Sequence, residues 1–205
     1  MNIEEEALIW ASITLVLSIL LTFFAGRHYF KSKNIMWLFW FLGFVLFVVA
    51  AICQEFFAFG IGGYLLSAIY VFSVAELVVI LSLGSIQQAP KNWIKVYYWY
   101  SFFVTIAIIG SILLQRFNVL ENYLPMNFPP VVMGTSSMGT IVGSGVILFF
   151  AAKALLFKGN KIKMSSVILG IVILGFGGTL VSGGFIEALY ISEFIGMSLF
   201  LYGIS

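Results

Sequence analysis

The stretch YLLSAIYVFSVAELVVILSLG, residues Tyr64–Gly84, contains one acidic residue, Glu76, and no basic residue. A helix needs about 20 mostly apolar residues to cross roughly 30 Å of hydrocarbon, and this stretch is long enough. Its Leu, Ile, Val and Phe residues favour insertion by more than the roughly 3 kcal/mol that one carboxylate costs. The stretch therefore predicts a transmembrane helix that carries a carboxyl group near the middle of the membrane.

Six other segments of the chain have the same apolar character. The seven predicted spans are Ala7–Gly26, Ile35–Phe57, Tyr64–Gly84, Val96–Gln115, Val131–Ala152, Met164–Ser182 and Phe185–Ile204. Strands are set aside as spans, because an open sheet leaves backbone groups unpaired in lipid and barrel strands alternate apolar with polar residues. We therefore expect an all-α, polytopic transmembrane helical bundle that forms a single domain over residues 1–205.

The composition excludes several classes of protein. Of the 205 residues, 62% are hydrophobic and 9% are charged, whereas about 25% of the residues of a soluble domain are charged. A water-soluble enzyme and a nucleic-acid-binding protein are excluded, and the lipid bilayer is the expected partner. A disulfide-stapled secreted domain is excluded because Cys53 is the only cysteine. Glu4, Glu5 and Glu6 stand where a signal peptide has basic residues, so we expect a retained first span.

The basic residues predict an orientation. Nine of the ten Lys and Arg residues lie after predicted spans one, three and five: Arg27, Lys31, Lys33, Lys91, Lys95, Lys153, Lys158, Lys161 and Lys163. Because basic residues concentrate in cytoplasmic loops, we expect a multi-pass protein of the cell membrane with its N-terminus outside and its C-terminus in the cytoplasm. An interfacial aromatic belt is expected at the cytoplasmic ends of spans two and four, from Trp37, Trp40, Trp93, Tyr97, Tyr98, Trp99 and Tyr100.

The ionisable residues inside the spans form the candidate site. Glu193 lies eight residues into the seventh span, and Tyr190 lies one turn before it on the same face. If the third and seventh spans touch, Glu76, Tyr190 and Glu193 form a polar centre that can hold a proton, a cation or a polar head group. Alternatively, each carboxyl group hydrogen-bonds a neighbouring hydroxyl or carbonyl and serves helix packing. A candidate outer mouth, which can also be a water-facing surface, consists of Glu55, Glu187 and Arg116.

Small residues at every fourth position predict where the helices pack closely, because lipid-embedded helices associate through close contact of their backbones. The predicted helix-packing residues are Thr135, Gly139 and Gly143 on the fifth span, Gly175, Thr179 and Gly183 on the sixth, and Ser192 and Gly196 on the seventh. Spans five to seven are therefore expected to be the most tightly packed part of the bundle.

An internal repeat is a further prediction. Spans one to three and five to seven share one pattern, in which a basic loop follows the first span, a Gly-rich turn follows the second, and the third contains a glutamate. The segments Leu66–Tyr70 and Ile186–Tyr190 also match in part. This 3+1+3 parallel arrangement resembles the SWEET and semiSWEET sugar carriers in topology alone. Those carriers have prolines inside their spans, whereas this chain has none there, so no function is carried over.

Residue counts argue against several kinds of chemistry. No span core contains a lysine for a retinal Schiff base, and His28 is the only histidine, which leaves no pair for a haem. We expect His28 to be a solvated residue of a basic loop. The chain has no Asp for a phosphate–Mg²⁺ site, and no cluster of Cys and His residues predicts a metal site. We therefore expect no cofactor.

Three functions remain open. The absence of cofactor ligands and of a soluble domain favours a non-catalytic accessory or anchoring subunit of a larger membrane complex, for example a respiratory one, with protein partners in the membrane. The alternative is a small-solute or proton-coupled transporter that uses the intramembrane carboxylates. A membrane-embedded enzyme that acts on lipids comes third, so an enzyme is the less favoured class.

Overall fold

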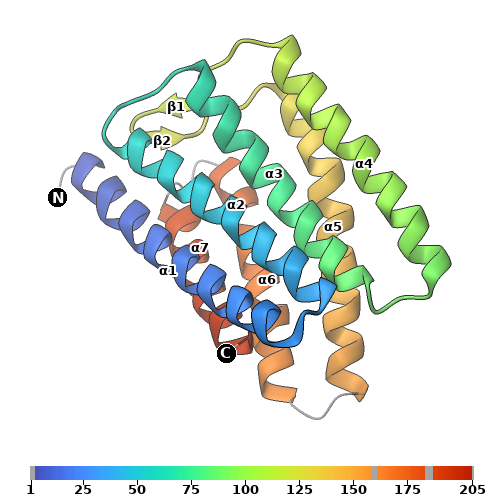
Figure 1. Cartoon of the computed structure of the whole chain (residues 1–205). Coiled ribbons are helices and arrows are strands. Elements are labelled where there is room, and N and C mark those ends of the chain that lie inside the picture. The colour runs from blue at the N-terminus through green and yellow to red at the C-terminus, as the bar shows by residue number, and fades with distance from the viewer. Residues whose placement is uncertain (1–2, 158–160, 183–186, 205) are drawn as a thin grey trace.

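The computed structural model describes residues 3–157, 161–182 and 187–204, and within these ranges the side chains of residues 5–174 and 190–204. The described residues form seven helices and one small hairpin (Figure 1). The helices are α1 (Ile3–Ser32), α2 (Ile35–Ala58), α3 (Tyr64–Ile86), α4 (Lys91–Leu114), α5 (Pro130–Phe157), α6 (Lys161–Ser182) and α7 (Glu187–Ile204). The prediction of an all-helical bundle is therefore confirmed.

Most helices extend beyond the predicted apolar spans. The span Val96–Gln115 becomes α4, which begins five residues earlier at Lys91 directly after Pro90, a residue that is well tolerated at a helix start. An apolar run marks only the part of a helix that lipid surrounds, so polar first and last turns are missed. Five helices are long and apolar enough to cross a membrane, namely α1 from Glu5 onward, α2, α3, α4 and α5, while α7 contributes a shorter apolar stretch, Tyr190–Ile204.

The connection between α4 and α5 contains a two-stranded antiparallel hairpin, β1 (Leu120–Glu121) and β2 (Leu124–Pro125). Both turn residues, Asn122 and Tyr123, have positive φ angles, of 49° and 65°. Positive φ at both central residues is the geometry of the tight turns that join two strands with a right-handed twist. Strands of two residues are too short to show the alternation of apolar and polar residues that predicts a strand from sequence.

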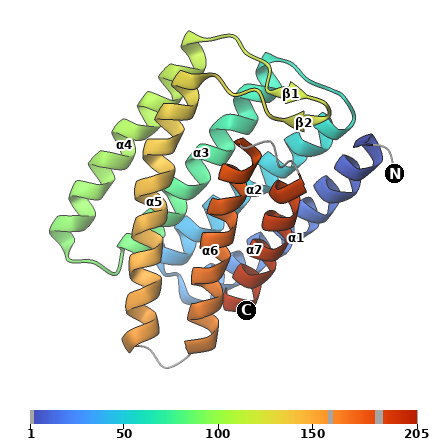
Figure 2. The same cartoon turned by 180° about the vertical axis from the view of Figure 1, so that it is seen from behind.

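The helices are arranged so that consecutive helices are neighbours and α1 lies beside α7 (Figures 1 and 2). Helix α3 is the most central helix, because it packs against α2, α4 and α5. Half of the residues in its most apolar stretch of 18 residues are buried inside the bundle. Helix α4 lies at the edge, where it packs mainly against α3 and α5. The bundle core is therefore built around α3.

The two ends of the bundle differ in charge. We call the end where α3 meets α4 and α1 meets α2 the basic end, because it carries the described residues Arg27, Lys31, Lys33, Lys91, Lys95, Lys153, Lys161 and Lys163. The opposite end, which carries β1 and β2, is called the hairpin end. His28 lies in α1 near the basic end, half-buried, where its ring stacks on Trp37 with centroids 4.5 Å apart. The expectation of a solvated loop histidine is wrong, because α1 continues through the basic segment and turns His28 toward α2 and the end of α7.

Two of the predicted packing glycines contact α3 and α4 rather than α6. A Cβ atom on Gly139 would lie 2.9 Å from Val79 and 3.0 Å from Val104, and one on Gly143 would lie 3.0 Å from Val78. The side chains of residues 175–183 lie outside the described residues, so the ridge of Gly175, Thr179 and Gly183 is not placed.

Helices α6 and α7 approach each other through three glycines. A Cβ atom on Gly170 would lie 2.8 Å from the carbonyl oxygen of Gly196, and one on Gly196 would lie 3.0 Å from the carbonyl oxygen of Gly170. Gly203 similarly faces the backbone at Lys163. Because these contacts involve backbone atoms, which cannot turn aside like a side chain, the two helices depend on glycine at these positions.

We expect Gly170→Ala to destabilise the bundle by about 1–3 kcal/mol, because the new methyl group must push the α7 backbone away. The measurement is the free energy of unfolding in mixed detergent micelles. Gly110→Ala is the matched control, since a Cβ atom there meets nothing within 4 Å. Equal stability of the two variants would contradict the described contact between α6 and α7.

Candidate functional site

A buried polar cluster joins four helices through Glu193 of α7. Thr14 of α1 donates its hydroxyl to one carboxyl oxygen of Glu193 over 3.1 Å, and the Gln54 amide of α2 donates to the other over 3.3 Å. The same Gln54 nitrogen lies 3.4 Å from the hydroxyl oxygen of Tyr70 on α3. All four side chains are at least nine-tenths buried. Both oxygens of Glu193 are thus partnered, as a carboxyl group away from water requires.

Tyr190 lies one turn before Glu193 and covers the cluster toward the hairpin end. Its ring stacks on Trp10 of α1, with centroids 6.2 Å apart and an interplanar angle of 11°. Ala58 at the end of α2 and Leu124 of β2 belong to the same buried cluster. The rings of Trp10 and Tyr190, together with Leu124 of the hairpin, therefore lie on the side of Glu193 that faces the hairpin end.

A cavity of about 290 Å³ lies directly beside the polar cluster, in the middle of the bundle. Every helix except α4 contributes to its described lining. We call it the central cavity, and its polar lining residues are Gln54, Tyr70, Thr140, Ser144 and Glu193. The rest of the described lining is apolar and includes the aromatic rings of Phe44, Phe47 and Phe200.

The charged lining of the central cavity, as far as it is described, is acidic and not basic. Among its described lining residues, Glu193 is the only acidic one, and none is Lys, Arg or His. The side-chain oxygen of Gln54 is buried and has no hydrogen-bond partner. A carboxyl group and a free amide oxygen at one end of an apolar space suit a ligand with an apolar body and a cationic or hydrogen-bond-donating head.

A second cavity of about 300 Å³ lies toward the basic end. We call it the vestibule; its described lining includes His28, Trp37, Trp40, Ser85 and Gln88. Ile147 lines both cavities.

Three aromatic rings lie where the two cavities approach each other. Phe44 and Phe200 line the central cavity, and Trp40 lines the vestibule. Trp40 lies 6.1 Å from Phe44 and 5.5 Å from Phe200 between ring centroids, and the two phenylalanines lie 5.9 Å apart. We call these residues the aromatic triad. Gly84 of α3 faces Trp40 so closely that any side chain at this position would collide with the indole.

Glu76 lies apart from Glu193. It is buried, with 3% of its surface exposed, and its carboxyl group has a hydrogen-bond partner in Thr105 of α4. Its other oxygen has no partner, and Glu76 is not among the described residues that line the central cavity. The structure therefore brings Tyr190 and Glu193 together, whereas Glu76 lies on the side of α3 that faces α4.

The three residues of the predicted outer mouth are not brought together within the described residues. Glu55 is half-buried near the end of α2, close enough to Tyr190 to interact electrostatically. Arg116 is exposed after α4, and no ion pair joins it to Glu55 in the described part of the chain. The side chain of Glu187 lies outside the described residues.

Sequence reasoning missed Thr14, Gln54 and Tyr70. Gln54 carried a usable signal, because a buried amide without hydrogen bonds costs several kcal/mol and this one lies inside a predicted span. Thr14 and Tyr70 carried none, since Thr and Tyr are frequent in membrane helices and only the packing shows what they face.

The chain stands apart in comparisons with known proteins. No protein-family model, no curated protein and no solved structure matches it significantly.

We expect Thr14→Val to lower the free energy of unfolding by about 0.5–2 kcal/mol, because one oxygen of Glu193 loses its donor. The substitution should have no further effect when Glu193 is already replaced by Met, which a double-mutant cycle in detergent measures. Thr22→Val is the matched control on the same helix, since Thr22 bonds only the Ser18 carbonyl of its own helix. Additive effects of Thr14→Val and Glu193→Met would contradict the coupling.

Proposed function

We propose that this chain is a small integral membrane carrier that binds an amphipathic organic cation in the central cavity, with Glu193 as the residue that neutralises its charge. The observation that carries the proposal is the central cavity itself, with one carboxyl group among mostly apolar walls in its described lining. The sequence alone favours an accessory subunit. It does not show that side chains of five other helices line a cavity together with Glu193 of α7.

The size and walls of the central cavity support a small, partly aromatic ligand. A water molecule occupies about 30 Å³ in the liquid, so 290 Å³ holds roughly ten groups of that size. The rings of Phe44, Phe47, Tyr70 and Phe200 line the space. Aromatic faces attract cations when water is excluded, so these walls favour a positive head group over a negative one.

Glu193 offers a means of coupling to protons. A single carboxylate neutralises one positive charge, so a proton and an organic cation compete for it. Thr14 and Gln54 donate hydrogen bonds to the two oxygens of this carboxyl group and so hold it in position for either occupant. A carrier of this kind exchanges one proton for one cation.

Coverings on both sides of the central cavity support alternating access. Trp10 and Tyr190 pack together near the hairpin, and the aromatic triad lies between the central cavity and the vestibule. A carrier must never open to both sides of the membrane at once, so it needs a separate group of side chains that can close on each side of its ligand site. The vestibule then serves as the route between the triad and the basic end.

We further propose that all seven helices span the membrane, with the basic end in the cytoplasm and the N-terminus outside. The separation of charge supports this orientation, because the described Lys and Arg residues other than Arg116 lie at one end. The 3+1+3 repeat remains a prediction. Packing of each helix against the next one in the sequence is expected both for two repeated three-helix units and for a bundle without a repeat.

The test is uptake of benzyltrimethylammonium, a small cation of fixed charge, into proteoliposomes with an acidic interior. We expect the wild-type protein to accumulate the cation and to release protons. Glu193→Gln keeps the shape of the side chain but removes its charge, so we expect at least a tenfold loss of uptake.

Glu76→Gln is the matched control, because Glu76 is also a buried glutamate but lies outside the central cavity. Its uptake should stay within twofold of wild type. An equal loss in both variants would contradict the assignment of Glu193, and a folded wild-type protein that neither binds nor accumulates the cation would exclude this carrier function.

A second candidate is the accessory subunit, which the exposed face of α4 supports. Trp93, Trp99 and Phe103 are each more than 60% exposed on this edge helix, a face that either lipid or another subunit covers. Under this function, extraction in a mild detergent should recover stoichiometric protein partners, identified by mass spectrometry. Recovery of the chain alone would exclude a stable subunit role.

A further inference from the structure

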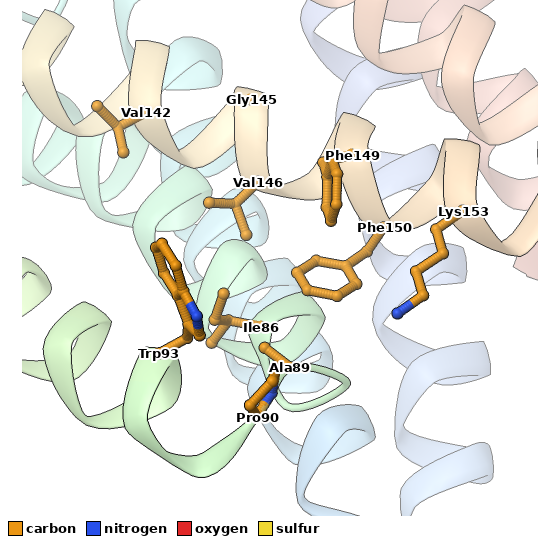
Figure 3. Close-up of a pocket in the computed structure, with 10 residues that line it drawn as sticks. All are labelled: Ile86, Ala89, Pro90, Trp93, Val142, Gly145, Val146, Phe149, Phe150 and Lys153. Carbon is orange, nitrogen blue, oxygen red and sulfur yellow. The ribbon is translucent and has the colours of Figure 1, made fainter.

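A third cavity lies on the outside of the bundle, near the basic end, between α5 and the connection from α3 to α4 (Figure 3). It is an open groove of about 500 Å³, lined on one side by residues of α5 and on the other by Ile86, Ala89, Pro90 and Trp93. We call it the lipid groove. All of its described lining is apolar except Lys153.

We propose that the lipid groove binds one anionic phospholipid from the leaflet at the basic end, with an acyl chain along α5 and the phosphate beside Lys153. This site is separate from the central cavity, and the proposal does not depend on the carrier function.

The length of the lipid groove matches one leaflet. Its α5 residues, which follow one another along the helix in Figure 3, are Val142, Gly145, Val146, Phe149, Phe150 and Lys153. The spacing of three and four residues keeps them on one face of the helix. At 1.5 Å per residue, the stripe from Val142 to Lys153 is about 16 Å long, and half of a bilayer's hydrocarbon core is about 15 Å thick. An acyl chain that lies along the stripe therefore begins at the basic end and reaches the middle of the membrane.

The charge of the groove's end selects a negative head group. Lys153 is exposed and lies at the end of the α5 stripe, while exposed Lys91 follows Pro90 directly and exposed Lys95 lies one turn further along α4. Within the described part of the chain, no acidic side chain lies at the basic end. Lysines at the edge of a membrane extend their ammonium groups to the head groups, and each contributes about fivefold to the affinity for anionic lipid.

Gly145 keeps the lipid groove open. A Cβ atom built on this residue meets nothing within 4 Å. The lack of a side chain at Gly145 is therefore not needed for any close contact between helices. Gly139 and Gly143 on the same helix differ, because side chains of α3 and α4 occupy the space beside these two glycines. Because Gly145 lines the groove and has open space at its Cβ position, a larger residue there would extend into the space of an acyl chain.

The experiment measures lipid binding by native mass spectrometry of the delipidated protein in detergent. Phosphatidylglycerol and phosphatidylcholine with identical acyl chains are compared, so that only the head-group charge differs. We expect one phosphatidylglycerol molecule to bind at least fivefold more tightly than phosphatidylcholine. Lys153→Gln should weaken phosphatidylglycerol binding about fivefold and leave phosphatidylcholine binding unchanged.

Gly145→Leu tests the acyl chain independently, and we expect it to reduce binding of both lipids at least tenfold. The matched controls are Lys31→Gln, an exposed lysine at the same end that does not line the groove, and Gly134→Leu, a second α5 glycine with open space around it. Equal affinity for the two lipids, or equal effects of Lys153→Gln and Lys31→Gln, would overturn the proposal. Retention of a protein partner instead of lipid in the groove would overturn it as well.

Discussion

Hydrocarbon cannot solvate a carboxyl group, and the arrangement of α7 depends on this constraint. Glu193 is nine-tenths buried, so each of its oxygens requires a donor from the protein. Thr14 and Gln54 supply these donors from α1 and α2. Helix α7 must therefore bring Glu193 within reach of both helices at this depth. Its packing against α1 closes the row of helices into a bundle, with the central cavity next to Glu193.

Close packing of glycine against large side chains shapes the remainder of the interior. Gly84 admits Trp40, which in turn contacts Phe44 and Phe200 and separates the central cavity from the vestibule. Lipid tails are as apolar as leucine, so helices in a membrane gain little from burying apolar surface and depend on such contacts. The same residues that hold the helices together therefore also determine where empty space remains.

The basic residues and the buried carboxyl groups lie at different positions along the axis of the bundle. The described basic residues, apart from Arg116, lie at one end, whereas the buried carboxyl groups of Glu76 and Glu193 lie between the ends. These groups therefore act in different surroundings. Most of the described lysines are exposed at the basic end, where charge is well solvated, whereas Glu193 is buried beside a mostly apolar cavity.

The amino-acid sequence by itself determined that the chain is helical and apolar, because helix length and hydrophobic composition are properties of continuous segments. It also identified Glu76, Tyr190 and Glu193, since ionisable and polar groups are conspicuous in apolar runs. Only the tertiary structure decided that Glu193 faces Gln54 and the central cavity while Glu76 faces α4. The physical reason is that depth along a helix can be counted from the sequence, whereas the neighbour that a side chain meets depends on how whole helices pack around one another.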